Sequence, residues 1–376
     1  MMQQIDDLIL IKQLGKGGFG QVYLSQKKNS NKYFATKKLN KAESDTKYRR
    51  YLLYEINILK TLNHPNIIKL EEVKKTTNHY YIVMEFANGG ELSKCLEKYK
   101  LKYQRAFPEE IVQYLMRQIV SALSHIHNFN IIHRDLKLEN IMLNFDSEKD
   151  KQELNMMKAQ IKIIDFGCAI VLPYPGAQGF TVVGTQPYMD PLILQEFYNQ
   201  AKTDAKVGYG QEVDIWSLGC LCYELIQGQI PFQGTLQEVI TKMSMGQYNL
   251  PPNSSPELID FLSKMLKYDG KSRLTAKQLL KHPFLANNIN PNKNRFAYHH
   301  SNSSPINPNI GMKAFNQYPN PNVPAYGQPQ PVNPQIYAQP GVYPNAQNPV
   351  PQAGIPYYPG APYQKRNTGN INNNYY

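Results

Sequence analysis

The sequence predicts an α+β protein of two lobes, a small β-sheet lobe followed by a larger, mostly helical lobe. Residues 8–84 alternate short runs of strand-forming residues with glycine punctuation, a pattern that predicts a five-stranded sheet. Residues 47–61 interrupt that pattern, because their apolar residues recur at helical spacing, and they predict a single main helix beside the sheet. Residues 85–90 then form a short connector, and helical periods dominate the second lobe at 91–285.

Residues 286–376 differ sharply in composition from the rest of the chain. They hold 16 of the 27 prolines and 10 of the 27 tyrosines, and Asn, Gln, Gly and Ala make up much of the remainder. Because branched apolar residues are scarce, burial cannot offset the entropy of ordering, and we predict a disordered tail with polyproline II character. Spacings such as Pro321/Pro324 and Pro356/Pro359 fit ligands of SH3 or WW domains, although a tether without a fixed partner is the simpler interpretation.

Charge and cysteine content argue against several classes of function. The net charge is +12, but the basic residues are scattered without a dense block, so no nucleic-acid partner is expected. The four cysteines contain no metal-type pair, which is typical of a reducing compartment. The N-terminus has no secretory leader pattern, and no apolar run reaches the length of a membrane span. We therefore expect a cytoplasmic or nuclear protein, and the sequence does not indicate its oligomeric state.

Two motifs in the helical part predict the chemistry, HRDLKLEN at 133–140 and a DFG string that begins at Asp165. Asp135 can accept the proton of an attacking hydroxyl, and Lys137 can offset charge on a moving phosphoryl group. Asn140 and Asp165 supply hard oxygen ligands, which suit Mg²⁺ held together with substrate phosphates. Phosphoryl transfer requires mainly positioning and charge neutralisation, so these residue types in this order indicate transfer from ATP.

A glycine-rich string, GKGGFGQV, lies between two predicted strands near the N-terminus. Glycine lets backbone amides approach phosphate oxygens without an intervening Cβ, but the same GxGxxG spacing occurs in dinucleotide-binding folds. A dinucleotide site requires a helix directly after the glycines, whereas a strand, VYLSQ, follows here. The string therefore favours a loop that covers the phosphates of a mononucleotide. The candidate nucleotide contacts in this region are Leu14, Gly15, Gly17, Gly18, Gly20 and Val22.

These motifs, in this order and spacing, resemble the eukaryotic protein kinase family over about three quarters of the chain, residues 8–285. The resemblance implies the bilobal protein-kinase fold, ATP and Mg²⁺ as cofactors, and proteins as substrates. The lysine two residues after Asp135 is similar to that of serine/threonine kinases rather than tyrosine kinases. The subfamily stays open among calmodulin-dependent, autophagy-initiating and polo- or aurora-like groups.

The resemblance also implies roles for residues outside the two central motifs. Lys37, on the predicted strand KYFATKKL, would hold the α- and β-phosphates and pair with Glu55 of the main helix, and Lys38 fits the pattern less well. Thr185 would hydrogen-bond Asp135 near the acceptor hydroxyl. Contacts with the adenine and the ribose are implied for Ala35, Met84, Glu85, Ala87, Glu91 and Met142, with Met84 as gatekeeper and the backbones of Glu85 and Ala87 on the adenine edge.

Two expectations concern substrates and regulation. Glu91 and Glu139 match positions that, in basophilic kinases, recognise arginines upstream of the acceptor, and Glu91 can equally hold the ribose. Thr181 is a candidate phosphorylation site, since Arg134 beside the catalytic aspartate could bind a phosphate there and order the activation segment, which runs from Asp165 to about Leu192.

The sequence departs from the family pattern at YMDPLIL, residues 188–194, where Leu192 replaces the glutamate of an Ala-Pro-Glu motif. In the family that glutamate pairs with the arginine that is Arg273 here, and either Asp190 or Glu196 could compensate for its loss. The departure keeps a second interpretation open, a pseudokinase or scaffold that binds nucleotide and partners without efficient catalysis. The residues that pseudokinases typically lose are nevertheless all present.

Overall fold

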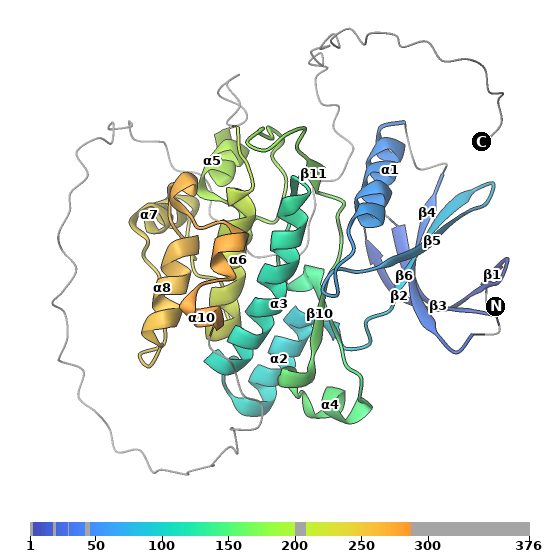
Figure 1. The fold of residues 1–376 in the computed structure, drawn as a ribbon, viewed down its shortest axis with the longest axis horizontal. Coiled ribbons are helices and arrows are strands. Elements are labelled where there is room, and N and C mark those ends of the chain that lie inside the picture. The colour runs from blue at the N-terminus through green and yellow to red at the C-terminus, as the bar shows by residue number, and fades with distance from the viewer. Residues whose placement is uncertain (1–2, 18–19, 29, 42–45, 200–207, 287–376) are drawn as a thin grey trace, which may run out of the picture. The chain divides into compact units, whose positions relative to one another are not determined.

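The structure of the protein is a computed structural model that describes residues 3–17, 20–28, 30–41, 46–199 and 208–286 (Figure 1). A β-sheet with one long helix comes first along the chain, and a mostly helical part follows it. This order confirms the predicted α+β class with its two kinds of lobe. The tail predicted at 286–376 lies outside the described residues, apart from Ala286.

The β lobe contains a six-stranded antiparallel sheet in the order β1-β2-β3-β4-β6-β5. The five predicted strands are present, and the short strand β1 adds a sixth at the edge beside β2. Because β1 has only three residues, it shows too little alternation to be recognised from sequence. The strands are β1 (Gln3–Ile5), β2 (Leu8–Gly17), β3 (Gly20–Lys27), β4 (Tyr33–Asn40), β5 (Leu70–Lys75) and β6 (His79–Glu85).

Strand β6 lies inside the β lobe with both of its faces buried. Successive side chains of a strand point to opposite faces. Tyr81 and Val83 therefore pack in one apolar cluster with residues of β1 and β2, while Tyr80 and Ile82 pack on the other face with residues of α1 (Thr46–Thr61). Burial on both faces explains why this strand is a continuous apolar run in the sequence.

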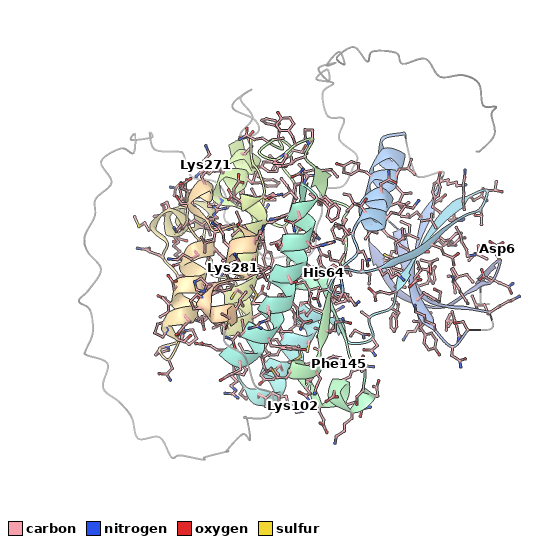
Figure 2. The ribbon with its side chains drawn as sticks, viewed as in Figure 1. Asp6, His64, Lys102, Phe145, Lys271 and Lys281 are labelled. Carbon is pink, nitrogen blue, oxygen red and sulfur yellow. The ribbon has the colours of Figure 1, made fainter. Side chains whose placement is uncertain are left out.

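Helices α3 and α6 lie in the middle of the helical lobe, and side chains fill the space around them (Figure 2). Helix α6 is buried almost all round, as its sequence suggests, since no charged residue stands between Asp214 and Glu224. The helices are α2 (Leu92–Tyr103), α3 (Glu109–Asn128), α4 (Glu148–Glu153), α5 (Pro191–Asn199), α6 (Glu212–Gln227), α7 (Leu236–Met245), α8 (Pro256–Met265), α9 (Ala276–Leu279) and α10 (Pro283–Ala286).

Two small sheets hold the segments that carry the sequence motifs. Strands β10, β9 and β7 form one sheet in that order, and β8 pairs with β11 in the other. The HRDLKLEN string lies between β8 and β9, and the DFG string lies between β10 and β11. These strands are β7 (Gly90–Glu91), β8 (Ile131–Ile132), β9 (Ile141–Asn144), β10 (Gln160–Ile163) and β11 (Ile170–Val171).

Four single 3-10 turns complete the described secondary structure, at Leu138–Asn140, Met156–Lys158, Gln186–Tyr188 and Gly270–Ser272. Among the described helices, none combines the length and the apolar character that crossing a membrane requires.

Candidate active site

The loop after β8 is anchored on helix α6 through one buried carboxylate. The backbone amides of His133 and Arg134 each donate to Asp214, at 2.8 Å, and His127 Nε2 donates to the same carboxylate at 2.9 Å. Burial would raise the pKa of Asp214, but the hydrogen bond from His127 and the neighbouring donors outweigh it and lower the pKa. The ionised carboxylate therefore fixes the backbone that precedes Asp135.

Three predicted site residues converge on Asp135. The Thr185 hydroxyl donates to Asp135 Oδ1 at 2.6 Å and accepts from Lys137 Nζ at 2.7 Å. Lys137 Nζ also lies 2.9 Å from Asp135 Oδ2. Asn140 Nδ2 donates to the backbone oxygen of Asp135 at 2.8 Å and to its Oδ2 at 3.0 Å. The carboxylate is thus held in a fixed orientation by residues of the catalytic loop, the HRDLKLEN string at 133–140, and of the segment before α5.

The same contacts set the charge state of Asp135. Burial would raise the pKa of this carboxyl, but the hydrogen bond from Thr185 and the positive charge of Lys137 outweigh burial and lower it. Asp135 is therefore ionised at neutral pH, as a group that accepts a proton must be.

Lys37 of β4 and Glu55 of α1 form a two-point ion pair. Lys37 Nζ lies 2.9 Å from Glu55 Oε1 and 3.1 Å from Oε2, and the two side chains are 14% and 10% exposed. Strand alternation places Lys37 on the same face of β4 as Leu39, which packs with α1, whereas Lys38 belongs to the opposite face. This alternation explains why Lys37 rather than Lys38 meets the helix.

The glycine-rich string forms the end of the β2–β3 hairpin, and its glycines have different surroundings. A Cβ added to Gly15 would meet nothing within 4 Å, so its backbone faces open space. Gly20 has φ +134°, and a Cβ there would lie 2.4 Å from the backbone oxygen of Lys38. Gly20 is therefore required by the sheet itself. Gly17 ends β2, and Gly18 lies outside the described residues.

The apolar residues predicted to contact adenine come from both lobes. Ala35 of β4 lies opposite Met84 of β6 in the sheet, and Met142 is on β9 of the helical lobe. Their side chains, like that of Val22, are only partly buried, and Leu14 is 46% exposed. These residues thus keep accessible apolar surface.

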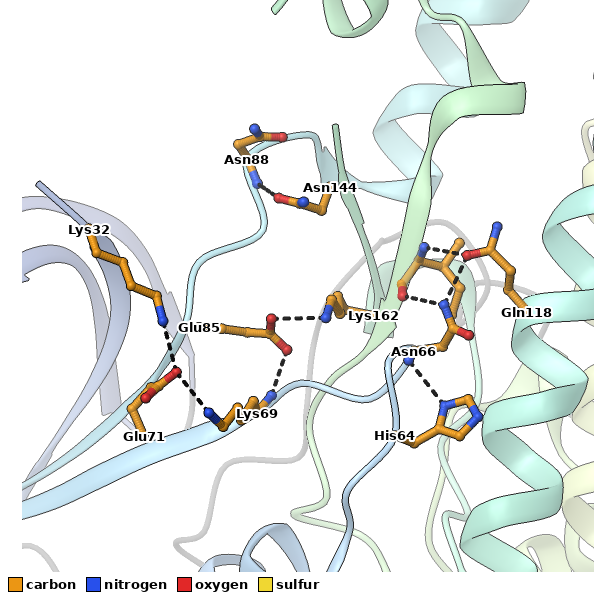
Figure 3. A network of polar contacts seen from close by, with 11 residues as sticks. Lys32, His64, Asn66, Lys69, Glu71, Glu85, Asn88, Gln118, Asn144 and Lys162 are labelled. Carbon is orange, nitrogen blue, oxygen red and sulfur yellow. Dashed lines mark hydrogen bonds and ion pairs between the residues drawn. The ribbon is translucent and has the colours of Figure 1, made fainter. Parts of the chain in front are cut away.

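The side chain of Glu85 joins the connector to both lobes (Figure 3). Its Oε1 accepts from the backbone amide of Lys69 at 2.7 Å, and its Oε2 pairs with Lys162 Nζ at 2.9 Å. A cavity of about 310 Å³ borders the connector here, and its lining includes Glu85, Ala87, Asn88 and Lys162. Glu85 and Ala87, whose backbones are predicted to contact the adenine edge, line this cavity, whereas Ala35 and Met142 do not.

The DFG string places Asp165 near the catalytic loop in a constrained backbone conformation. Asp165 has φ +60°, which is uncommon for a residue other than glycine, and its Oδ1 accepts from Gly167 N at 3.1 Å. Phe166 is buried and packs edge-on against His133, with ring centroids 5.1 Å apart. Among the described residues, no group of three His, Cys, Asp or Glu could hold a metal ion. Asn140 and Asp165, the two metal ligands predicted from sequence, stay a prediction.

The predicted substrate-recognition carboxylates are accompanied by a third that the sequence did not reveal. Glu91 pairs with Lys94 at 2.6 Å, and Glu139 is exposed. Glu224 of α6 accepts a hydrogen bond from the Tyr188 hydroxyl. Burial, together with the nearby charge of Glu139, raises the pKa of Glu224 to about 7. The sequence analysis does not single out Glu224, and a carboxylate within the apolar run DIWSLGCLCYELI is the signal that could have identified it.

The structure resolves the question raised by Leu192. Arg273 Nη1 pairs with Asp190 Oδ2, and both side chains are almost completely buried. Arg273 also donates to the backbone oxygens of Lys267 and Glu212, each at 2.8 Å. Leu192 is 38% exposed and points to no such partner. Asp190 thus supplies the carboxylate that the family motif would place two residues later.

The Arg134 side chain connects the catalytic loop to the activation segment. Its Nε donates to Cys168 O at 2.5 Å, and its Nη1 donates to the Tyr209 hydroxyl at 2.7 Å. The Tyr209 hydroxyl in turn donates to the backbone oxygen of Thr181 at 2.5 Å. Thr181 is exposed, and the Arg134 guanidinium is linked to its backbone through the Tyr209 hydroxyl.

Comparison with known proteins identifies the family of this site. The family model described as the protein kinase domain matches residues 8–285. The chain belongs to the eukaryotic protein kinase family. The kinase is 35% identical over 298 residues to "Myosin light chain kinase A" of Dictyostelium discoideum, covering 77% of this chain and 92% of that protein.

Other relatives are longer proteins. The kinase is 34% identical to "Probable serine/threonine-protein kinase MARK-A" of Dictyostelium discoideum, covering 75% of this chain and 24% of that protein. It is 31% identical to "Serine/threonine-protein kinase PLK4" of Drosophila persimilis, covering 73% of this chain and 33% of that protein. The predicted membership of the serine/threonine kinase family is thereby confirmed, and the fold implies that the kinase uses ATP.

Proposed function

We propose that this kinase transfers the γ-phosphate of Mg·ATP to serine and threonine hydroxyls of protein substrates. The observation that carries the proposal is the convergence of Thr185, Lys137 and Asn140 on an ionised Asp135. The attacking hydroxyl oxygen bonds to the γ-phosphorus, the bond from phosphorus to the β-phosphate oxygen breaks, and the hydroxyl proton passes to Asp135. Lys137, beside both Asp135 and Thr185, is placed to offset charge on the moving group.

The remaining predicted residues are assigned to nucleotide binding. Lys37, held by Glu55, binds the α- and β-phosphates, and the glycine hairpin with Gly15 covers them. Asn140 and Asp165 would hold Mg²⁺, which would neutralise charge on the phosphate oxygens. The Asp190–Arg273 pair supports an active kinase over a pseudokinase, since Leu192 was the one sequence feature that favoured the latter.

The proposal is tested with the purified full chain, labelled ATP and three peptides that differ only in a Ser, Thr or Tyr acceptor. We expect transfer to serine and threonine but not to tyrosine, and loss of transfer when EDTA removes the metal. Mass spectrometry of the active protein is expected to find phosphate on Thr181, where it would meet Arg134. A folded protein that binds Mg·ATP but transfers nothing, even after phosphorylation of Thr181, would establish the pseudokinase interpretation instead.

We further propose that arginines upstream of the acceptor are recognised at Glu139, as predicted, and at Glu224. Glu91, the other residue predicted for this role, pairs with Lys94. The charge of Glu224 depends on pH, because burial holds its pKa at about 7, and a carboxyl group is neutral below its pKa and charged above it. The KM for a peptide with upstream arginine is therefore expected to fall between pH 6 and pH 8, while the KM for a peptide without it stays constant. Changing either carboxylate to glutamine should raise the KM for the arginine peptide about tenfold, the size of one charge-assisted hydrogen bond.

The matched control is Glu97→Gln, which removes an exposed carboxylate on α2. This variant should leave both KM values unchanged. Equal KM values for the two peptides at every pH would contradict recognition of basic residues. Partners of the proline-rich tail with SH3 or WW domains, and a cytoplasmic or nuclear location, are proposals that rest on the sequence alone.

A further inference from the structure

The residue before Glu55 on helix α1 reaches the activation segment. The hydroxyl of Tyr54 accepts a hydrogen bond from the backbone amide of Val171, at 2.5 Å, and lies 3.5 Å from the carbonyl oxygen of the same residue. Val171 is the last residue of β11, six residues after Asp165. A single side chain of the β lobe thus contacts both backbone groups of one residue in the helical lobe.

The geometry of β11 leaves those two groups in need of a partner. Within the described part of the chain, strand β11 pairs only with β8, and the amide of Leu172 donates back to the backbone oxygen of Asn130 at 2.8 Å. In an antiparallel pair the backbone groups of successive residues point to opposite sides. The N–H and C=O of Val171 therefore point away from β8, toward α1. The Tyr54 hydroxyl, which can both donate and accept, matches this pair of groups.

The same short stretch is held from its other side by the catalytic loop. Arg134 Nε donates to Cys168 O at 2.5 Å, three residues before Val171. The stretch between the DFG string and β11 is therefore fixed by Arg134 from the helical lobe and by Tyr54 from the β lobe. Any rotation of α1 that separates Glu55 from Lys37 also moves Tyr54, since adjacent residues of a helix turn together.

We propose that Tyr54 is a positioning residue whose hydroxyl links α1 to the activation segment and so keeps Glu55 in reach of Lys37. The inference rests on the proposed function, because the Lys37–Glu55 pair matters through the phosphates it holds. The alternative role of Tyr54 is that of a half-exposed tyrosine that contributes to stability alone, as its 37% exposure would permit.

The test is Tyr54→Phe in the full chain, which keeps the ring and removes the hydroxyl. We expect kcat/KM for ATP to fall about three- to tenfold, the range for loss of a neutral hydrogen bond, with KM for the peptide unchanged. The matched control is Tyr174→Phe, since the Tyr174 ring is 63% exposed and its hydroxyl has no partner within the described residues. That control should retain the wild-type kcat/KM.

A double-variant cycle separates positioning from stability. In a Glu55→Gln background, Tyr54→Phe should cause no further loss of kcat/KM, because the group it positions has already been changed. Hydrogen exchange provides a second readout, with faster exchange expected in α1 of Tyr54→Phe and unchanged exchange in α3. A wild-type kcat/KM for Tyr54→Phe, or the same fold-loss in both backgrounds, would overturn the proposal. If the wild-type chain transfers no phosphate, the proposed function fails, and the α1 exchange rates still decide whether Tyr54 holds the helix.

Discussion

Asp135→Asn in the full chain is expected to lower kcat by about 100- to 10,000-fold, the range for loss of a positioned general base. Asparagine keeps the shape of the side chain and can still accept from the Thr185 hydroxyl, but an amide cannot take up the proton of the attacking hydroxyl. The carboxylate is ionised in the folded protein because Thr185 and Lys137 lower its pKa, so the wild-type base can accept a proton at neutral pH. Initial rates at saturating ATP and peptide measure the loss.

Two further variants define what that loss means. Asp146→Asn makes the same chemical change at an exposed position and should retain the wild-type rate. Asp165→Ala should also abolish transfer, but with weakened metal dependence of nucleotide binding, because it removes a proposed metal ligand. All three variants should unfold within a few degrees of the wild type. Retention of more than a tenth of the wild-type kcat by Asp135→Asn would mean that the proton goes elsewhere.

The sequence predicted the parts of this site that lie within a recognisable motif or a single secondary-structure element. The resemblance to the protein kinase family implied the pair of Lys37 and Glu55, and the HRDLKLEN motif itself contains Asp135, Lys137 and Asn140. The five principal strands were predictable from their own runs of strand-forming residues. Strand β1 was not, since its pairing with β2 depends on a neighbour rather than on its own three residues.

Other features depend on contacts between residues far apart in the sequence. Glu224 is an active-site candidate only because Tyr188, 36 residues earlier, meets it. Gly20 owes its requirement for glycine to the backbone of Lys38 on the next strand as well as to any phosphate. The choice between Asp190 and Glu196 as partner of Arg273 likewise depends on where the segment before α5 lies relative to Arg273, which no periodic pattern encodes.

Asp190→Ala is expected to lower the free energy of unfolding by about 3–5 kcal/mol, the usual cost of removing one partner of a buried ion pair. The Arg273 side chain is 1% exposed, so water cannot replace the lost carboxylate. Asp190 also accepts from the backbone amide of Leu192 at 2.8 Å, so the start of α5 loses a hydrogen bond as well. Since whole domains are stable by only about 5–15 kcal/mol, thermal or urea unfolding should show the change directly.

Variants at Leu192, where the sequence differs from the family motif, and at the Asp190–Arg273 pair decide whether Asp190 has replaced the family glutamate. Leu192→Glu alone should change stability by less than about 0.5 kcal/mol, because Leu192 is exposed and Arg273 already has its carboxylate. Asp190→Ala combined with Arg273→Met should cost less than the sum of the two single changes, because no buried charge is then left unpaired. Additive losses would show that the two residues do not stabilise one another. Recovery of Asp190→Ala by Leu192→Glu would show that the start of α5 can turn far enough to present either position to Arg273, and that the departure from the family motif is an exchange of one carboxylate for another.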